Sequence, residues 1–192
     1  MILQDFFRKN LKLTDDELVS RLLDAAKYEH LKKGRLLIEA GEVQTKLTFL
    51  LDGILRGFLV NEDGQETTDG FSCRYGEIVM GDSRLDAPSR ISIEAIEDSI
   101  LLVIPMETFT GALPQYPELW QLYTGHLTEA LERHWEEKML LRACSATVRY
   151  QWFLEAYPGL INQISNKYIA SFLGITPVSL SRIRSQLREK EA

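Results

Sequence analysis

Short apolar segments separated by glycines over residues 31–110 constrain the fold more than any other feature of this chain. Segments such as RLLIEAG, LTFLLDG and RISIEAIEDSILLVIP have the composition of strands, and a turn signal separates each from the next. The dipeptides Asp52-Gly53 and Asp63-Gly64 are strong signals for hairpin turns. Repeated hairpins of short strands predict a closed or double-sheet antiparallel structure such as a jelly roll.

Helical patterns flank this β region on both sides. Residues 1–30 contain LTDDELVSRLLDAAKYEH, in which Thr14 is the expected N-cap and acidic residues follow in the first turn. Residues 115–138 belong to a longer helix with a wide apolar stripe. Four of its residues follow one another at intervals of seven, the spacing of a coiled-coil seam: Trp120, Leu127, His134 and Leu141. The pattern allows either a dimer seam or an amphipathic helix docked on its own domain.

The segment ISNKYIASFLGITPVSLSRIRSQL, at 164–187, has the local signals of two short helices joined by a tight turn. Ser165 is placed to cap the first helix, and Gly174 stands where the backbone must turn in a left-handed conformation. Thr176 and Pro177 have the types expected at the N-cap and first position of a second helix. The apolar positions at which the helices would cross are Ile169, Leu173, Ile175, Leu180 and Ile183. Together these residues predict a helix-turn-helix.

The second of these helices carries the side chains expected to contact double-stranded DNA. In a helix-turn-helix, the early outward side chains of the second helix enter the major groove. Arg182 is the expected base reader, because a guanidinium pairs with two acceptors of guanine. Hydroxyl groups and further cations would contact phosphate. The predicted DNA-binding residues are Thr176, Pro177, Val178, Ser179, Ser181, Arg182, Arg184 and Lys167.

The charge is divided along the chain in a way that fits two functions. The formal net charge is -6. Residues 139–192 nevertheless contain seven Lys or Arg and three Asp or Glu, so this segment is basic and residues 1–138 are acidic. A basic carboxyl-terminal part is the electrostatic pattern expected of a nucleic-acid-binding segment.

Other classes of protein find little support in the composition. The two cysteines form no CxxC pair, and the stretch 31–125 contains no histidine, so a metal centre of the cupin type is not expected. There is no Gly-x-Ser-x-Gly or Walker-type motif, and we expect no catalytic residue, no enzyme activity and no cofactor. Apolar runs are too short for a membrane span, and without a targeting signal the cytoplasm is the expected location.

The glycine-punctuated β segment, the long helix and the helix-turn-helix, in this order, resemble the Crp/Fnr family of bacterial transcription regulators. In the first half the matching residues are Gly34, Gly41, Gly53, Gly64 and Gly76. The resemblance implies an α+β fold: an antiparallel β-roll (a double-stranded jelly-roll, cyclic-nucleotide-binding-like), a long dimerisation helix and a C-terminal winged helix-turn-helix. It also implies a sensor domain at 1–138, whose dimerisation helix spans about 115–138, and a DNA-binding domain at 139–192.

The resemblance further implies partners and a mechanism. Family members are similar homodimers in which a small effector, bound in the β-roll, changes the placement of two recognition helices on DNA. RNA polymerase is an expected partner on the same ground. The residues expected in the homodimer interface are Trp120, Tyr123, Leu127, Leu131 and His134. Two alternatives remain: a β-roll interaction or scaffold protein that does not bind DNA, and a DNA-binding regulator that needs no effector.

The effector segment departs from the family's phosphate-binding pattern of Gly-Glu, a short helix and Arg-Ser. Gly81 matches, Asp82 replaces the Glu, and the segment is shorter. The Arg position falls on Ser89, which carries no charge to neutralise a phosphate, and the Ser position falls on Arg90. We therefore expect an effector other than cyclic AMP. The candidate pocket residues are Gly81, Asp82, Ser83, Arg84, Ser89 and Arg90.

Overall fold

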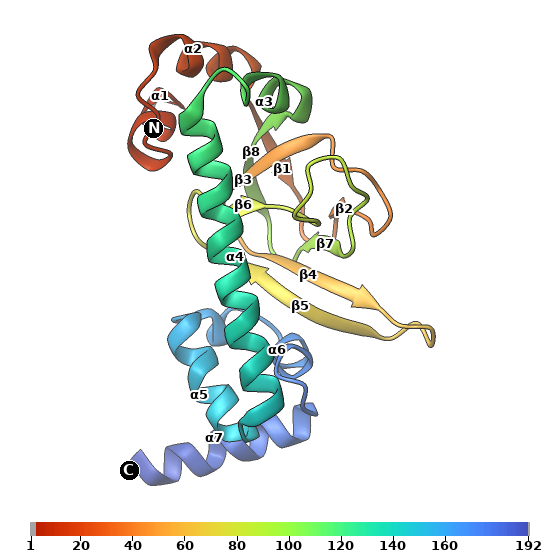
Figure 1. The fold of residues 1–192 in the computed structure, drawn as a ribbon. Coiled ribbons are helices and arrows are strands. Elements are labelled where there is room, and N and C mark those ends of the chain that lie inside the picture. Colours follow the sequence, from red (N-terminus) through yellow and green to blue (C-terminus); the bar gives the residue numbers. More distant parts are fainter. Residues whose placement is uncertain (1–2, 192) are drawn as a thin grey trace. The chain divides into compact units, whose positions relative to one another are not determined.

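The computed structural model describes the backbone of residues 3–191 and the side chains of residues 3–189. The chain forms two compact units that share one long helix, α4 (Pro117–Ala143) (Figure 1). The first unit ends at Glu129 and leaves out the segment Val60–Gly70. That segment belongs to the second unit, together with the residues from Ala130 onward. The predicted boundary between 138 and 139 stays a prediction.

Two antiparallel four-stranded sheets form the predicted β-roll. The first has the order β1-β8-β3-β6, with bounds Lys27–Leu31 (β1), Ser99–Pro105 (β8), Lys46–Asp52 (β3) and Ile78–Val79 (β6). The second has the order β2-β7-β4-β5, with bounds Leu36–Ile38 (β2), Ser92–Ala95 (β7), Leu55–Val60 (β4) and Glu66–Ser72 (β5). Alternate residues of each strand face inward, so Leu55 and Ile93 pack with Leu101 and Val103 between the sheets.

The hairpin turns lie at the predicted Asp-Gly dipeptides. Gly53, between β3 and β4, has φ +104°, and Gly64, between β4 and β5, has φ +74°. Backbones with positive φ favour glycine because a β-carbon would crowd the chain. The two positions differ in their surroundings. A β-carbon at Gly64 would meet nothing, whereas one at Gly53 would lie 2.7 Å from the Cα of Ser99.

Helices cover one end of the roll and form a second hydrophobic cluster there. Phe6 and Phe7 are fully buried, and the ring of Phe6 packs edge-on against that of Phe49 in β3. Leu119 joins this cluster from the first turn of α4. The elements around it are α1 (Leu3–Asp5), the π-helix η1 (Phe6–Asn10), α2 (Asp16–Ala25) and α3 (Met106–Ala112). This packing fixes the start of α4 in the first unit.

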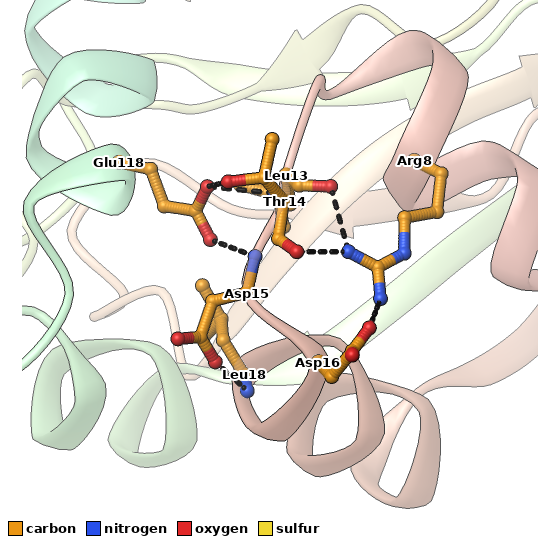
Figure 2. Close-up of polar contacts among 7 residues, drawn as sticks. All are labelled: Arg8, Leu13, Thr14, Asp15, Asp16, Leu18 and Glu118. Carbon is orange, nitrogen blue, oxygen red and sulfur yellow. Dashed lines mark hydrogen bonds and ion pairs between the residues drawn. The ribbon is translucent and has the colours of Figure 1, made fainter.

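The expected N-cap of α2 at Thr14 is wrong: the cap is Asp15, whose carboxylate accepts a hydrogen bond from the Leu18 backbone N–H at 2.8 Å. The reason lies far away in the sequence. The carboxylate of Glu118 in α4 accepts hydrogen bonds from the Thr14 N–H, the Thr14 hydroxyl and the Asp15 N–H, at 2.8, 3.1 and 3.1 Å (Figure 2). On the other side of the same turn, the Arg8 guanidinium contacts the Asp16 carboxylate (Figure 2). Because Glu118 engages the Thr14 hydroxyl, the next residue along the chain takes the capping role.

The carboxyl-terminal part consists of helices. They are α5 (Ala146–Ala156), the 3₁₀-helix η2 (Leu160–Asn162), α6 (Asn166–Phe172) and α7 (Pro177–Glu191). The predicted helix-turn-helix is confirmed in α6 and α7, but the predicted wing is not found within residues 3–191. No strand follows β8 in that range. The segment after α6, where a wing would be expected, is the single helix α7 from Pro177 to Glu191.

Candidate nucleic-acid interface

Hydrogen bonds from nearby residues cap the starts of α6 and α7, as the sequence predicts. The Ser165 hydroxyl accepts a hydrogen bond from the Lys167 N–H at 3.3 Å at the start of α6. Gly174 has φ +62° in the turn. The Thr176 hydroxyl oxygen then accepts the Ser179 N–H at 3.1 Å, which places Thr176 at the N-cap of α7. Each cap satisfies a backbone donor that the helix itself leaves unpaired.

Apolar contacts hold the two helices together and onto α5. Four of the five predicted crossing residues are buried, and the fifth, Ile175, is half-buried. Sequence reasoning missed an aromatic cluster beneath them, in which Trp152 of α5 stacks on Phe172 of α6 with their ring planes at 20°. The rings of Phe153 and Tyr157 complete this cluster. The aromatic cluster therefore packs α6 onto α5.

Two of the predicted DNA-binding side chains extend from α7 without a partner. Val178 is 61% exposed. Arg182 is exposed and makes no hydrogen bond, ion pair or ring contact among residues 3–189. An arginine that the fold leaves unpaired keeps all its donors for a ligand. Ser181 and Pro177 are exposed beside them, and Lys167 is exposed on α6.

The structure engages the remaining predicted residues in contacts of their own. Arg184 donates from Nη1 to Asn166 Oδ1 at 2.8 Å, which joins α7 to the first turn of α6. The hydroxyls of Thr176 and Ser179 lie 2.9 Å apart. These three side chains are thus oriented by contacts within the protein.

The candidate effector segment, residues 81–90, forms bends and turns and not the short helix that the resemblance implies. A β-carbon at Gly81 would lie 1.8 Å from the Oγ and 2.8 Å from the Cβ of Ser89, so glycine leaves room for the Ser89 side chain. Ser89 itself is buried, and its hydroxyl donates to the carbonyl of Ile91 at 2.5 Å. The position of the family's arginine is therefore occupied by a buried hydroxyl with a partner of its own.

The Asp82 carboxylate forms ion pairs with the two arginines of this segment. Its side chain is 2% exposed, and its carboxylate lies 2.6 Å from the Nε of Arg90 and 3.5 Å from that of Arg84. The backbone N–H of Arg84, aided by the Arg90 guanidinium, lowers the pKa of Asp82 against the opposing effect of burial. Arg90 is 73% exposed but is directed to this carboxylate. The two predicted cations thus already have an anionic partner within the chain.

The long helix α4 presents apolar side chains that its own chain does not cover. Of the predicted interface residues, Trp120 and Leu131 are 48% and 58% exposed. Tyr123 instead packs edge-on against Phe109, and its hydroxyl donates to the Ser83 carbonyl at 2.5 Å. Two residues that the sequence reading did not select, Trp135 and Met139, are 54% and 58% exposed. Leu131, Trp135 and Met139 follow at spacings that place them on one helix face, which we call the α4 apolar face.

His134 on α4 is expected to make stability depend on pH. Its Nδ1 lies 3.6 Å from the Glu137 carboxylate, and this contact with Glu137, aided by the charge of Asp69, raises the pKa of His134. Because folding raises this pKa, the protonated form of His134 stabilises the folded protein. The stabilisation is complete at pH values below the ordinary histidine pKa of about 6.5, and it is lost as the pH rises through the pKa of His134 in the folded protein. Because His134 is 64% exposed, we expect only about 0.2–1 kcal/mol.

Thermal midpoints measured from pH 5 to pH 9 test this pH dependence. His134→Gln should remove the part of the decrease that begins near pH 6.5, and His30→Gln is the control that should retain it. Identical pH profiles for wild type and His134→Gln would contradict the assignment.

No group of three or more His, Cys, Asp or Glu among the described residues is arranged to hold a metal ion. None of the helices in that part of the chain has the length and hydropathy to cross a membrane.

Comparisons with known proteins agree with this geometry. The family model of the cyclic nucleotide-binding domain matches residues 28–116. The transcriptional regulatory protein btr of Bordetella pertussis is 26% identical over 181 residues, which cover 85% of this chain and 74% of that protein. The fumarate and nitrate reduction regulatory protein of Yersinia pestis is 23% identical, with coverage of 83% and 68%.

A solved structure shares the fold as well. FixK2 from Bradyrhizobium japonicum superposes with a TM-score of 0.78 at 19% identity, and the match covers 86% of each chain. The paired sheets, the long helix and the capped helix pair are thus found in the order that the sequence predicts, and two curated regulators match along most of the chain. The chain is therefore similar to a cyclic nucleotide-binding domain over residues 28–116 and to two transcriptional regulators over most of its length.

Proposed function

We propose that this protein is a homodimeric transcription regulator that binds double-stranded DNA through α6 and α7. The observation that carries the proposal is Arg182, which is exposed and unpaired within residues 3–189 on a helix whose N-terminus is capped. In this geometry the early outward residues of α7 enter the major groove, and Arg182 pairs with guanine. Residues 139–192 act as the DNA-binding part.

The α4 apolar face supplies the dimer contact in this proposal. Leu131, Trp135 and Met139 are each more than half exposed. A second copy of α4 would cover them by a two-fold arrangement, which suits two recognition helices that must reach half-sites about 34–36 Å apart. RNA polymerase and a cytoplasmic location belong to the same proposal, and the similarity to bacterial transcription regulators supports both.

The effector in this proposal is a small molecule other than cyclic AMP. Asp82 already pairs with both Arg84 and Arg90, and Ser89 offers no charge to a cyclic phosphate. An anionic ligand would have to compete with the Asp82 carboxylate for either arginine, which lowers the gain from binding. The segment 81–90 remains the candidate contact region for a ligand of different chemistry.

The function is tested by Arg182→Ala. We expect a loss of about 1–3 kcal/mol in binding to the preferred duplex and a relaxed preference at one base pair of each half-site. The preferred duplex is first selected by the wild-type protein from a random-sequence pool, and the affinities are then measured by fluorescence anisotropy.

Arg188→Ala is the matched control, because Arg188 is an exposed arginine further along the same helix. It should weaken binding to all duplexes by a similar factor and leave base preference unchanged. A wild-type protein that selects no duplex would refute the function, and an unaltered base preference in Arg182→Ala would remove Arg182 from base reading.

A further inference from the structure

The outward side chains in the first turn of α7 are apolar. Pro177 and Val178 are both exposed, and Val178, at 61%, is the most exposed large apolar side chain among the described residues. The turn contains no acidic residue. The hydroxyls of Thr176 and Ser179 are hydrogen-bonded to each other at 2.9 Å. The part of α7 that would enter a major groove first therefore presents hydrocarbon and not a hydrogen-bonding side chain.

Val178 lies on the same face of α7 as the unpaired Arg182. Residues four apart are neighbours on a helix surface, and Leu180 and Ile183 are buried on the opposite side of α7. Four residues of an α-helix span about 6 Å along its axis, and successive base pairs of DNA are about 3.4 Å apart. A helix that brings Arg182 to one base pair therefore brings Val178 to another about two base pairs away.

The chemistry of Val178 restricts what it can recognise there. Valine has no side-chain donor or acceptor, and the 5-methyl of thymine is the apolar group that base edges present in the major groove. Against that methyl, both surfaces leave water with a gain in free energy. Against an amino group or a ring acceptor, valine would remove water from a polar group without pairing it, which costs free energy. Val178 is thus complementary to one feature of the groove.

The fold also holds Val178 in place before any ligand arrives. The Thr176 hydroxyl accepts the Ser179 N–H at 3.1 Å and fixes the start of α7. A β-branched side chain in a helix keeps essentially one χ1 rotamer. Contact with a base would therefore order little that is not already ordered, and most of the gain from burying the methyl would remain as affinity.

We propose that Val178 is a specificity-determining residue that recognises the 5-methyl group of a pyrimidine, about two base pairs from the base pair that Arg182 contacts. The methyl group is the recognised feature, so 5-methylcytosine at this position would make the same contact and unmodified cytosine would not. Affinity would then respond to cytosine methylation at that base pair. This inference rests on the proposed function, because it concerns the same recognition helix.

Deoxyuridine tests the contact, because it differs from thymidine only in lacking the methyl group. Each thymine in one half-site of the duplex selected by wild type is replaced in turn, and affinities for the full chain are measured by fluorescence anisotropy. At one position the replacement should weaken wild type roughly fourfold, the value of one buried methyl. Val178→Ala should show no such loss there. At the same position, wild type should prefer 5-methylcytosine to cytosine by a similar factor, and Val178→Ala should bind the two equally.

Val148→Ala is the matched control, since Val148 is an exposed valine on α5. It should respond to each replacement as wild type does. A thymine at which only wild type and Val148→Ala lose affinity supports the inference. Equal responses of wild type and Val178→Ala at every thymine, or a selected half-site without thymine, overturn it while DNA binding stands. A wild-type chain that selects no duplex overturns the proposed function as well.

Discussion

Replacing Gly53 with alanine is expected to lower the free energy of unfolding by about 3 to 5 kcal/mol. Two effects add at this position. The φ of +104° is strained for any residue with a β-carbon, and that carbon would lie 2.2 Å from the Oγ and 2.7 Å from the Cα of Ser99. The side chain of Ser99 can rotate, but Ser99 is the first residue of β8 and its backbone pairs with that of Leu31 in β1. Relief would therefore require movement of a central strand.

The matched control is Gly64→Ala, which separates strain from collision. Gly64 has φ +74° but open space around its missing β-carbon. We expect this variant to lose about 1–2 kcal/mol, the cost of a left-handed conformation alone. Urea unfolding followed by circular dichroism measures both variants. Equal losses for Gly53→Ala and Gly64→Ala would show that the roll adjusts around Ser99 without cost.

Charge placed on the α4 apolar face is expected to weaken the proposed homodimer strongly. Leu131→Glu combined with Met139→Glu would bury four unpaired carboxylates in a two-fold seam, because each protomer contributes both changes. The lost apolar burial and the added desolvation together should weaken dimerisation by more than about 100-fold, or roughly 3 kcal/mol. Binding to a two-half-site duplex should fall in parallel, because a monomer reads only one half-site.

Sedimentation measurements on the full chain decide this prediction. Leu154→Glu is the control, since Leu154 is an exposed leucine on α5, outside the α4 apolar face. It should leave the association state unchanged. A double variant that sediments as the wild type does would place the dimer contact elsewhere, or show that the protein is a monomer.

The helix-turn-helix was predictable because its signals are local. Ser165, Gly174 and Thr176 act on backbone groups within three residues of themselves, so the sequence alone carries the geometry. The alternation of the strands and the Asp-Gly turns are local in the same sense. The residues that depend on distant neighbours were not predictable in this way. Thr14 gives way to Asp15 as N-cap because Glu118 lies against it.

The candidate effector segment and the α4 helix show the same limit. Tyr123 has the spacing of a seam residue, but Phe109 and the Ser83 carbonyl hold it within its own unit. Helical periodicity gives the direction of a side chain but not which residues surround it, so Trp135 and Met139 were not among the predicted interface residues. Equally, a sequence comparison can align Arg90 with a ligand position, but only the fold shows that Asp82 is its partner.

The distribution of tryptophan gives this protein its own optical reporters. The chain has three tryptophans. Trp120 and Trp135 lie about half exposed on α4, and Trp152 is stacked on Phe172 beneath the helix-turn-helix. Since none lies in a strand of the roll, intrinsic emission reports on α4 and on the base of α7. Covering the two indoles of α4 would move that emission to shorter wavelength, so subunit association can be followed without an attached dye.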